Sequence, residues 1–247
     1  MCIVHRGLIL DLDGVITDTA SIHFKAWKNV FDSVLQSLEL KADFSTQDYL
    51  QFVDGKSRIE GVRSYLRARN LDLPVEGGGD HRLNSVDGIA LTKNAVFLEL
   101  ISSLGVTVFS DAQELMRQAK LRKIPLGLAS SSKNAKAVLA SVNLLNYFDA
   151  VLDGAEAEKL GIESKPHGDF YRKAAGSLQL LPGDCVAVED AVSGIVSSVA
   201  AGMGLVVGVA RGGNARELLD AGACVVSESI SDVQNDIFKF IETGAKK

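Results

Sequence analysis

The chain has 247 residues, enough for one large domain or two modest ones, and 47% of them are hydrophobic while 23% are charged. This ordinary globular composition argues against a disordered, collagen-like or coiled-coil protein. The net charge of −5 offers no basic surface for nucleic acid. The longest stretch of apolar residues and glycine, 199–210, is too short to span a membrane.

The cysteines and the amino-terminal segment indicate the compartment. Cys2, Cys185 and Cys224 are scattered and lack zinc-binding spacing, so we expect small core residues in a reducing compartment. Residues 1–10 contain a His-Arg interruption and no small-residue cleavage site, so we expect no signal peptide. The sequence therefore predicts a cytoplasmic protein.

Short apolar runs typical of buried parallel strands recur along the chain. They cover 7–10, 125–129, 150–152, 185–188, 205–209 and 224–226. Segments with helical spacing lie between the later runs, at 111–121, 133–142, 170–178, 193–201, 215–221 and 232–241. This alternation predicts an α/β fold with a doubly wound parallel sheet.

A helical block interrupts this pattern after the first strand. Its first helix carries an apolar stripe at three- and four-residue intervals: Ile22, Ala26, Trp27, Val30, Phe31, Val34 and Leu38. Further helices are expected over 49–53, 59–69 and 90–104, with a loop over 73–88 that contains Gly77–Gly79. We therefore predict a core domain of residues 1–15 and 104–247 and an inserted helical domain of residues 16–103.

Polar residues gather where the predicted strands end, which is where open α/β sheets bind ligands. They are Asp11-Leu12-Asp13-Gly14, Ser130-Ser131-Ser132, the Ser164-Lys165-Pro166 turn and Glu189-Asp190. Carboxylates such as Asp11, Glu189 and Asp190 are hard oxygen ligands of the kind Mg²⁺ prefers. Two carboxylates two residues apart can serve as a nucleophile and a proton shuttle. Positive and polar groups such as Lys165 and Ser130 suit a transferring phosphoryl group, and amides at the start of the helix at 133 would add an anion site.

Each of these signals has a simpler interpretation when it is taken alone. Asp11 and Asp13 fit a turn or a helix cap, Glu189-Asp190 complements a helix amino terminus, and Lys165 fits a solvated surface. Their occurrence together, in order and each at a strand end, favours a phosphoryl-transfer site.

These segments resemble the four motifs of the haloacid dehalogenase superfamily, and the resemblance covers nearly the whole chain. The motif residues are Asp11-Leu12-Asp13-Gly14-Val15-Ile16-Thr17-Asp18-Thr19, Ala129-Ser130, Lys165-Pro166 and Glu189-Asp190. Further residues resemble the β-phosphoglucomutase-like subgroup: His23-Phe24, Ala26-Trp27-Lys28, Gly55, Ser57-Arg58, Lys93-Asn94 and Ser132-Lys133-Asn134. The insert after the first strand matches the small helical cap of that superfamily.

The resemblance implies roles for the core residues. Asp11 corresponds to a nucleophile that becomes aspartyl-phosphate and binds Mg²⁺, and Asp13 to a general acid/base whose carbonyl contacts the metal. Glu189 and Asp190 correspond to the other metal ligands. The transferring-phosphate site takes in Ser130, Lys165 and the nearby Asn134.

In the cap, the resemblance implies that Arg58 holds the non-transferring phosphate, since a guanidinium suits bidentate phosphate binding better than Lys56 does. Thr19, His23, Trp27 and Lys93 correspond to hinge residues and residues that line the sugar site. Core packing for His23 and Trp27, and a solvated position for Lys93, remain open alternatives. His81 and the cap glycines match no motif, and His167 either flanks the site or caps a helix.

The expected function is Mg²⁺-dependent phosphoryl transfer on a small sugar phosphate. The subgroup implies a mutase that converts β-glucose 1-phosphate into glucose 6-phosphate, with a sugar 1,6-bisphosphate as a candidate activator. A sugar-phosphate phosphatase is the alternative, in which water attacks the aspartyl-phosphate. A non-enzymatic phospho-acceptor or sugar-phosphate sensor is more remote, because Asp13 serves turnover and receiver-type domains lack the insert. The acidic surface and the core–cap design favour a monomer.

Overall fold

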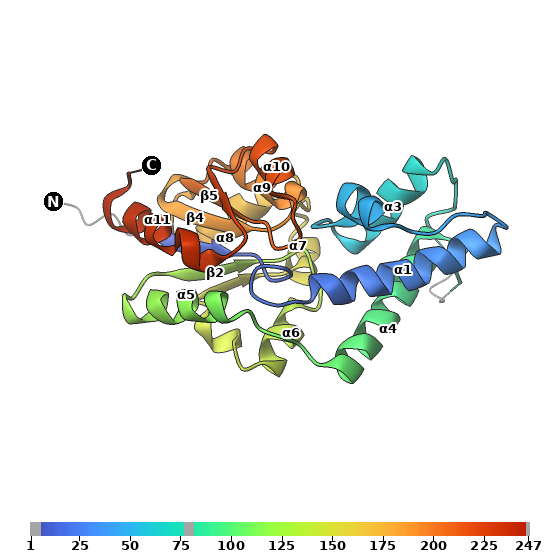
Figure 1. The fold of residues 1–247 in the computed structure, drawn as a ribbon, viewed down its shortest axis with the longest axis horizontal. Coiled ribbons are helices and arrows are strands. Elements are labelled where there is room, and N and C mark those ends of the chain that lie inside the picture. The colour runs from blue at the N-terminus through green and yellow to red at the C-terminus, as the bar shows by residue number, and fades with distance from the viewer. Residues whose placement is uncertain (1–5, 77–81, 246–247) are drawn as a thin grey trace. The chain divides into compact units, whose positions relative to one another are not determined.

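The computed structural model describes residues 6–76 and 82–245, so Cys2, Gly77–Gly79 and His81 lie outside the described residues. The chain divides into two compact units (Figure 1). Unit 1 contains Met1–Asp18 and Thr107–Lys247, and unit 2 contains Thr19–Val106. Of the helices that the structure describes, none combines the length and the apolar character needed to cross a membrane.

Unit 1 is built on a six-stranded sheet in which every neighbouring pair is parallel. The strands are β1 (Gly7–Leu10), β2 (Leu126–Ala129), β3 (Ala150–Leu152), β4 (Cys185–Glu189), β5 (Leu205–Val209) and β6 (Val225–Ser227). Their order is β3-β2-β1-β4-β5-β6, so the chain extends the sheet in one direction from β1 and then in the other. The topological switch point therefore lies between β1 and β4, where Leu10 pairs with Val188.

Helices cover both faces of the sheet, which explains why its central strands are apolar on both sides. On one face α8 (Asp169–Ser177), α9 (Val192–Ala201) and α10 (Ala215–Asp220) pack on Ile9, Ala187 and Val206. Helices α5 (Ser110–Leu121) and α11 (Ile230–Thr243) contact each other and the strands. Two short helices, α6 (Ala135–Ser141) and α7 (Gly154–Lys159), follow β2 and β3. The predicted doubly wound α/β fold is confirmed.

Every secondary-structure element described in unit 2 is a helix, and loops connect these helices. Its elements are α1 (Ala20–Ser37), α2 (Thr46–Asp48), the π-helix η1 (Tyr49–Val53), α3 (Arg58–Ala68) and α4 (Val86–Leu104). An aromatic cluster forms its core, with Trp27 stacked on Phe31 at 5.0 Å and Phe31 packed on Tyr65 at 4.2 Å. The predicted helical insert after the first strand is confirmed.

Some local predictions are wrong, and each has a physical reason. Helix α1 ends at Ser37, so Leu38 lies past the stripe and is 40% exposed, whereas Leu35 is buried. The loop predicted over 73–88 ends earlier, because the Ser85 side chain accepts a hydrogen bond from Gly88 and caps α4.

Two predictions in unit 1 also need correction. The helix expected from residue 133 starts at Ala135, because the Ser132 hydroxyl accepts the amide of Asn134 in a local turn. Cys185 is a buried core residue as predicted, but Cys224 is exposed just before β6.

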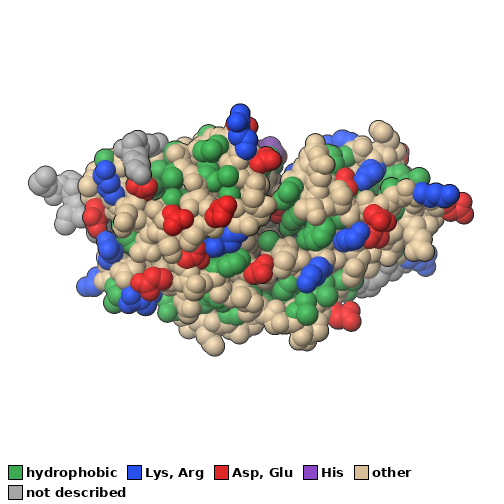
Figure 2. Space-filling model, in the orientation of Figure 1, with side chains coloured by type: hydrophobic (Ala, Val, Ile, Leu, Met, Phe, Trp, Pro, Cys, Tyr) green, Lys and Arg blue, Asp and Glu red, His purple; other side chains and the backbone are tan. Residues whose placement is uncertain are grey.

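On the face shown in Figure 2, basic and acidic side chains are interspersed over each unit.

Candidate active site

The loop after β1 presents Asp11 at the switch point of the sheet. The Asp11 amide donates to the Val188 carbonyl at 3.0 Å, which ties the end of β1 to β4. The chain then turns back, with the Gly14 amide donating to the Thr17 carbonyl at 2.8 Å. Gly14 has a φ of +81°, and a Cβ there would lie 1.7 Å from Asp190 Oδ2. Only glycine allows both this backbone conformation and this close approach of the Asp190 carboxylate.

Lys165 lies at the centre of the site and is only 1% exposed. Its Nζ donates to Asp11 Oδ1 at 2.7 Å, to Glu189 Oε1 at 2.5 Å and to the Ala129 carbonyl at 2.8 Å. These three bonds use all three donors of an ammonium group. Burial would lower the pKa of Lys165, but the charges of Asp11 and Glu189 outweigh it and hold that pKa above the ordinary value. Lys165 is therefore a buried cation and not a solvated lysine.

Glu189 is held from several sides at the end of β4. Its Oε1 accepts from Lys165 and from the Tyr171 hydroxyl, the latter at 2.7 Å. Burial raises the pKa of Tyr171 well above its usual value, so that hydroxyl stays a donor. Gly194 of α9 makes room for the carboxylate, since a Cβ there would lie 2.2 Å from both Glu189 oxygens. The same carboxylate oxygen accepts both of these hydrogen bonds, which orients the group.

Asp11, Glu189 and Asp190 form a candidate cation site. One carboxylate oxygen from each lies within 4.8 Å of the others. Burial raises the pKa of Asp11, and the nearby Glu189 and Asp13 carboxylates add to this effect while Lys165 opposes it. Three carboxylates beside one ammonium leave negative charge that a divalent cation would balance, and hard oxygen donors suit Mg²⁺. The residues present therefore fit a divalent metal. The Asp13 side chain is outside this cluster, so the predicted contact through its carbonyl stays a prediction.

The segment after β2 carries the other predicted phosphate ligands. Ser130 is fully buried, its amide donates to the Leu152 carbonyl at 3.0 Å, and its hydroxyl accepts the Ser132 amide at 3.2 Å. Asn134 directly precedes α6 and follows the Ser130–Ser132 turn closely in the sequence. Lys133 lies at the surface in an ion pair with Glu158 at 2.6 Å.

In unit 2, three of the predicted residues come together. The Lys93 ammonium contacts Nδ1 of His23 and lies over the rings of Trp27 and Phe97, at 5.1 and 4.6 Å. The His23 ring stacks on Phe97 with centroids 3.9 Å apart. Lys93 is 3% exposed, so the alternative of a solvated helix residue is wrong.

Arg58 and Lys56 differ in the groups to which their side chains donate hydrogen bonds. Lys56 donates to the Phe52 carbonyl and the Ser64 hydroxyl, each at 2.9 Å, and burial lowers its pKa. Arg58 begins α3 and donates to Asn94 Oδ1 at 2.7 Å.

The roles expected for Thr19 and His167 stay predictions. Thr19 is fully buried just before α1. The exposed His167 side chain pairs with Glu163 at 3.0 Å.

The sequence interpretation missed four residues that adjoin the acidic residues or their loops. Tyr171 and Gly194 adjoin Glu189, Arg211 donates to the Gly14 carbonyl, and Asn214 donates to the Asp190 carbonyl. Tyr171 sits in an apolar helical stripe that predicts only core packing. The isolated glycine at 194 inside a helical pattern is a signal that often marks close packing and could have been used.

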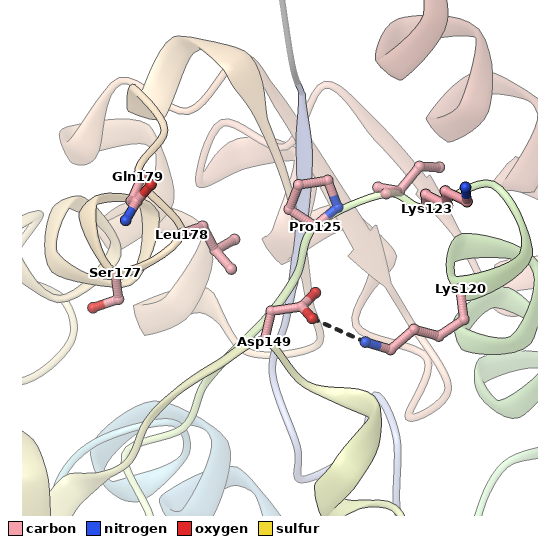
Figure 3. Close-up of a pocket in the computed structure, with 8 residues that line it drawn as sticks. Lys120, Lys123, Pro125, Asp149, Ser177, Leu178 and Gln179 are labelled. Atoms are coloured by element: carbon pink, nitrogen blue, oxygen red, sulfur yellow. Dashed lines mark hydrogen bonds and ion pairs between the residues drawn. The ribbon is translucent and has the colours of Figure 1, made fainter.

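The pocket of about 470 Å³ in Figure 3 lies at the amino-terminal ends of the strands. Its lining includes Ile124 and Pro125, which precede β2, and Asp149, which precedes β3. Asp149 accepts from Lys120 at 3.0 Å and from the Leu126 amide at 2.8 Å. The amino-terminal edge of a parallel sheet is opposite the edge that carries Asp11, so this pocket is separate from the candidate active site.

Comparisons with known proteins identify the family of this chain. Residues 5–202 match the family described as haloacid dehalogenase-like hydrolase. The β-phosphoglucomutase of Mycobacterium bovis is 34% identical over 239 residues, covering 92% of this chain and 91% of that one. A phosphorylated carbohydrates phosphatase of Thermotoga maritima is 27% identical, covering 94% and 99%. The crystal structure of β-phosphoglucomutase from Clostridium difficile superposes with a TM-score of 0.77 at 27% identity, covering 98% of each chain. With its motif residues at the switch point of this fold, the chain belongs to the haloacid dehalogenase-like hydrolase family and is an enzyme of the phosphomutase or phosphatase type.

Proposed function

We propose that this enzyme catalyses Mg²⁺-dependent phosphoryl transfer on a small sugar phosphate, and that it is a β-phosphoglucomutase. The observation that supports this is the buried Asp11 carboxylate at the switch point, held by Lys165 at 2.7 Å beside Glu189 and Asp190. Similarity to a mutase over 92% of the chain favours the mutase outcome.

In the first step, a carboxylate oxygen of Asp11 attacks the phosphorus of the substrate, and the bond from phosphorus to the leaving oxygen breaks. Asp13, two residues further along the loop, donates the proton that this oxygen takes up. Lys165 keeps Asp11 Oδ1 in place, and Ser130 and Asn134 supply polar groups for the phosphoryl oxygens. When bound by the carboxylates, Mg²⁺ supplies positive charge that offsets the charge of the transferring group.

In the second step, a hydroxyl oxygen attacks the phosphorus on Asp11, the bond to the Asp11 oxygen breaks, and Asp13 takes the hydroxyl proton. In a mutase, the phosphoryl group goes to one end of a sugar monophosphate, and the resulting 1,6-bisphosphate turns round before it gives back its other phosphate. A trace of sugar 1,6-bisphosphate therefore acts as the activator. In a phosphatase, water supplies the hydroxyl and orthophosphate leaves.

In this proposal, unit 2 recognises the rest of the substrate. Arg58, whose planar guanidinium suits a phosphate, holds the non-transferring phosphate. Thr19, His23, Trp27 and Lys93 serve the sugar site, since the contacts among His23, Trp27 and Lys93 combine a buried cation with aromatic faces.

A sugar-phosphate phosphatase is the second candidate. The similarity to the Thermotoga maritima protein covers 94% of this chain, and that protein is named as a phosphorylated carbohydrates phosphatase. The two reactions share Asp11, Asp13 and the cation site and differ only in which hydroxyl attacks in the second step.

One assay separates these functions. Purified protein is incubated with β-glucose 1-phosphate, Mg²⁺ and a trace of the 1,6-bisphosphate, and both glucose 6-phosphate and orthophosphate are measured in the same tube. Glucose 6-phosphate without matching orthophosphate supports the mutase, while orthophosphate without isomerisation supports the phosphatase. If neither product forms, glucose phosphate is the wrong substrate, and a panel of phosphate esters tests the phosphoryl-transfer proposal itself.

A further inference from the structure

The loop between β5 and α10 contains Arg211-Gly212-Gly213-Asn214, and none of these residues belongs to the family motifs found in the sequence. Its two polar side chains nevertheless reach the two acidic loops of the candidate active site. Arg211 contacts the loop after β1, and Asn214 contacts the loop after β4. Backbone carbonyls accept both hydrogen bonds, so these bonds restrain the positions of the two loops.

Arg211 is itself held firmly. Its Nε donates to the Gly14 carbonyl at 3.1 Å, and its Nη2 donates to Asp111 Oδ1 at 2.8 Å. Its guanidinium lies over the ring of Phe109 at 3.9 Å. The other oxygen of Asp111 accepts the amide of Ile230 at 2.9 Å, which anchors the pair to the start of α11. A planar guanidinium with several donors suits such a fixed geometry.

Asn214 occupies the residue before α10, where an asparagine side chain usually accepts an amide of the first helical turn. Here it makes no such bond, and its Nδ2 donates to the Asp190 carbonyl at 2.9 Å. Its Oδ1 is buried without a hydrogen-bond partner among the described residues. A buried polar atom left unpaired is unfavourable, so this side chain gives up local stability while it holds Asp190.

The two acidic loops also meet directly, because the missing side chain of Gly14 leaves the space that the Asp190 carboxylate fills. Arg211 binds the carbonyl on one side of this contact, and Asn214 binds the carbonyl on the other. Glycine gives the loop after β1 more conformational freedom than another residue would, so an external restraint matters there.

We propose that Arg211 and Asn214 are positioning residues that hold the Asp11–Asp13 loop and the Glu189–Asp190 pair at a fixed spacing. This rests on the proposed function, in which those carboxylates bind Mg²⁺ and transfer the phosphoryl group. The alternative is that Arg211 and Asp111 form an ordinary ion pair that only stabilises unit 1.

The test uses Arg211→Met, which keeps an unbranched apolar stem and removes the guanidinium donors, and Asn214→Ala. Arg216→Met is the matched control, because Arg216 is exposed on α10 and its ion pair with Asp220, at 3.0 Å, lies within that helix. For each variant, Mg²⁺ affinity is measured by titration calorimetry without substrate, together with kcat, KM and the unfolding temperature. Assays are run well below the lowest unfolding temperature.

We expect Arg211→Met and Asn214→Ala to weaken Mg²⁺ binding by about 10- to 100-fold, as is typical when residues that orient metal ligands are lost. The value of kcat falls at least about tenfold while KM changes little, since the substrate contacts remain. Arg211→Lys, which keeps the charge but not the planar fork, restores the unfolding temperature more than the Mg²⁺ affinity. If Arg211→Met fails to fold, Arg211→Lys and Asn214→Ala carry the test.

The proposal is overturned if the variants match Arg216→Met in Mg²⁺ affinity and kcat and differ only in unfolding temperature. The titration separates this result from a failure of the proposed function. If the wild-type protein binds Mg²⁺ but turns over no sugar phosphate, a loss of affinity in Arg211→Met still supports the positioning role. A wild-type protein that binds no Mg²⁺ overturns both.

Discussion

Substituting Gly194 with alanine tests whether the Glu189 carboxylate depends on the space that this glycine leaves. Gly194 lies in the first turn of α9, and a Cβ there would sit 2.0 Å from Cδ of Glu189. Ordinary contact begins at 3.4 Å, so the carboxylate would have to move by about 1.4 Å. Glu189 is 1% exposed and is held by Lys165 at 2.5 Å and Tyr171 at 2.7 Å, so it cannot move without breaking these bonds.

The expected magnitude follows from two opposing effects. Alanine is favoured over glycine inside a helix by about 1 kcal/mol. Each hydrogen bond to the Glu189 carboxylate contributes about 1.5–3 kcal/mol, because one partner is charged. Losing both outweighs the gain in helix propensity, so Gly194→Ala should lower the free energy of unfolding by about 2–5 kcal/mol. The displaced carboxylate should also weaken Mg²⁺ binding by about 10- to 100-fold.

Gly176→Ala in α8 is the matched control, since a Cβ at that helical position would meet nothing within 4 Å. This variant should be as stable as the wild type or slightly more stable. Chemical unfolding and Mg²⁺ titration calorimetry are run on both variants and the wild type. Equal stability and equal Mg²⁺ affinity in the two variants would refute the idea that Gly194 makes room for a fixed Glu189.

Three further outcomes are expected. Asp11→Asn should abolish turnover at any Mg²⁺ concentration while the protein stays folded by circular dichroism, and residual activity above a few per cent would rule out Asp11 as the nucleophile. Arg58→Ala should reduce turnover of a sugar phosphate far more than that of a small aryl phosphate; equal losses would mean that Arg58 does not hold a second phosphate. Burial raises the pKa of Cys185 from 9.0 to about 12. Above about pH 9 the unfolded chain loses this proton and the folded chain keeps it, so stability should fall by up to about 1.4 kcal/mol per pH unit until about pH 12. Between pH 8 and 11, the free energy of unfolding measured by chemical denaturation should fall less in Cys185→Ala than in the wild type. The same dependence on pH in both proteins would contradict the raised pKa of Cys185.

The positions of Asp11 and Glu189 could be predicted from the sequence, because one rule about the ends of parallel strands brings them together. Asp11 and Glu189 are far apart in the chain, yet each directly follows or ends a buried apolar strand. The carboxyl ends of parallel strands share one edge, so two such residues are expected near each other once the strands are recognised. Lys165 required more than this rule, because it lies in a turn before α8, and its three hydrogen bonds depend on the whole sheet.

The residues that support the carboxylates could not be predicted in the same way. Tyr171 occupies a buried helical position, and hydrophobic periodicity reports that it is buried but not that its hydroxyl faces Glu189. Helix boundaries near the site shift for a similar reason, since the Ser132 turn before α6 is made by side-chain hydrogen bonds that periodicity does not detect.

A carboxylate cluster needs space as well as charge, and these two requirements leave different traces in a sequence. Charge is visible, because an ionisable residue at the end of an apolar strand is rare enough to notice. Space is provided by the absence of a side chain, as at Gly14 beside Asp190 and Gly194 beside Glu189. Glycines also serve turns and helix ends, so one in the sequence does not say which carboxylate it accommodates. A Cβ at either position would meet a carboxylate within 2.2 Å, so each of these glycines is as necessary to the arrangement as the acidic residue beside it.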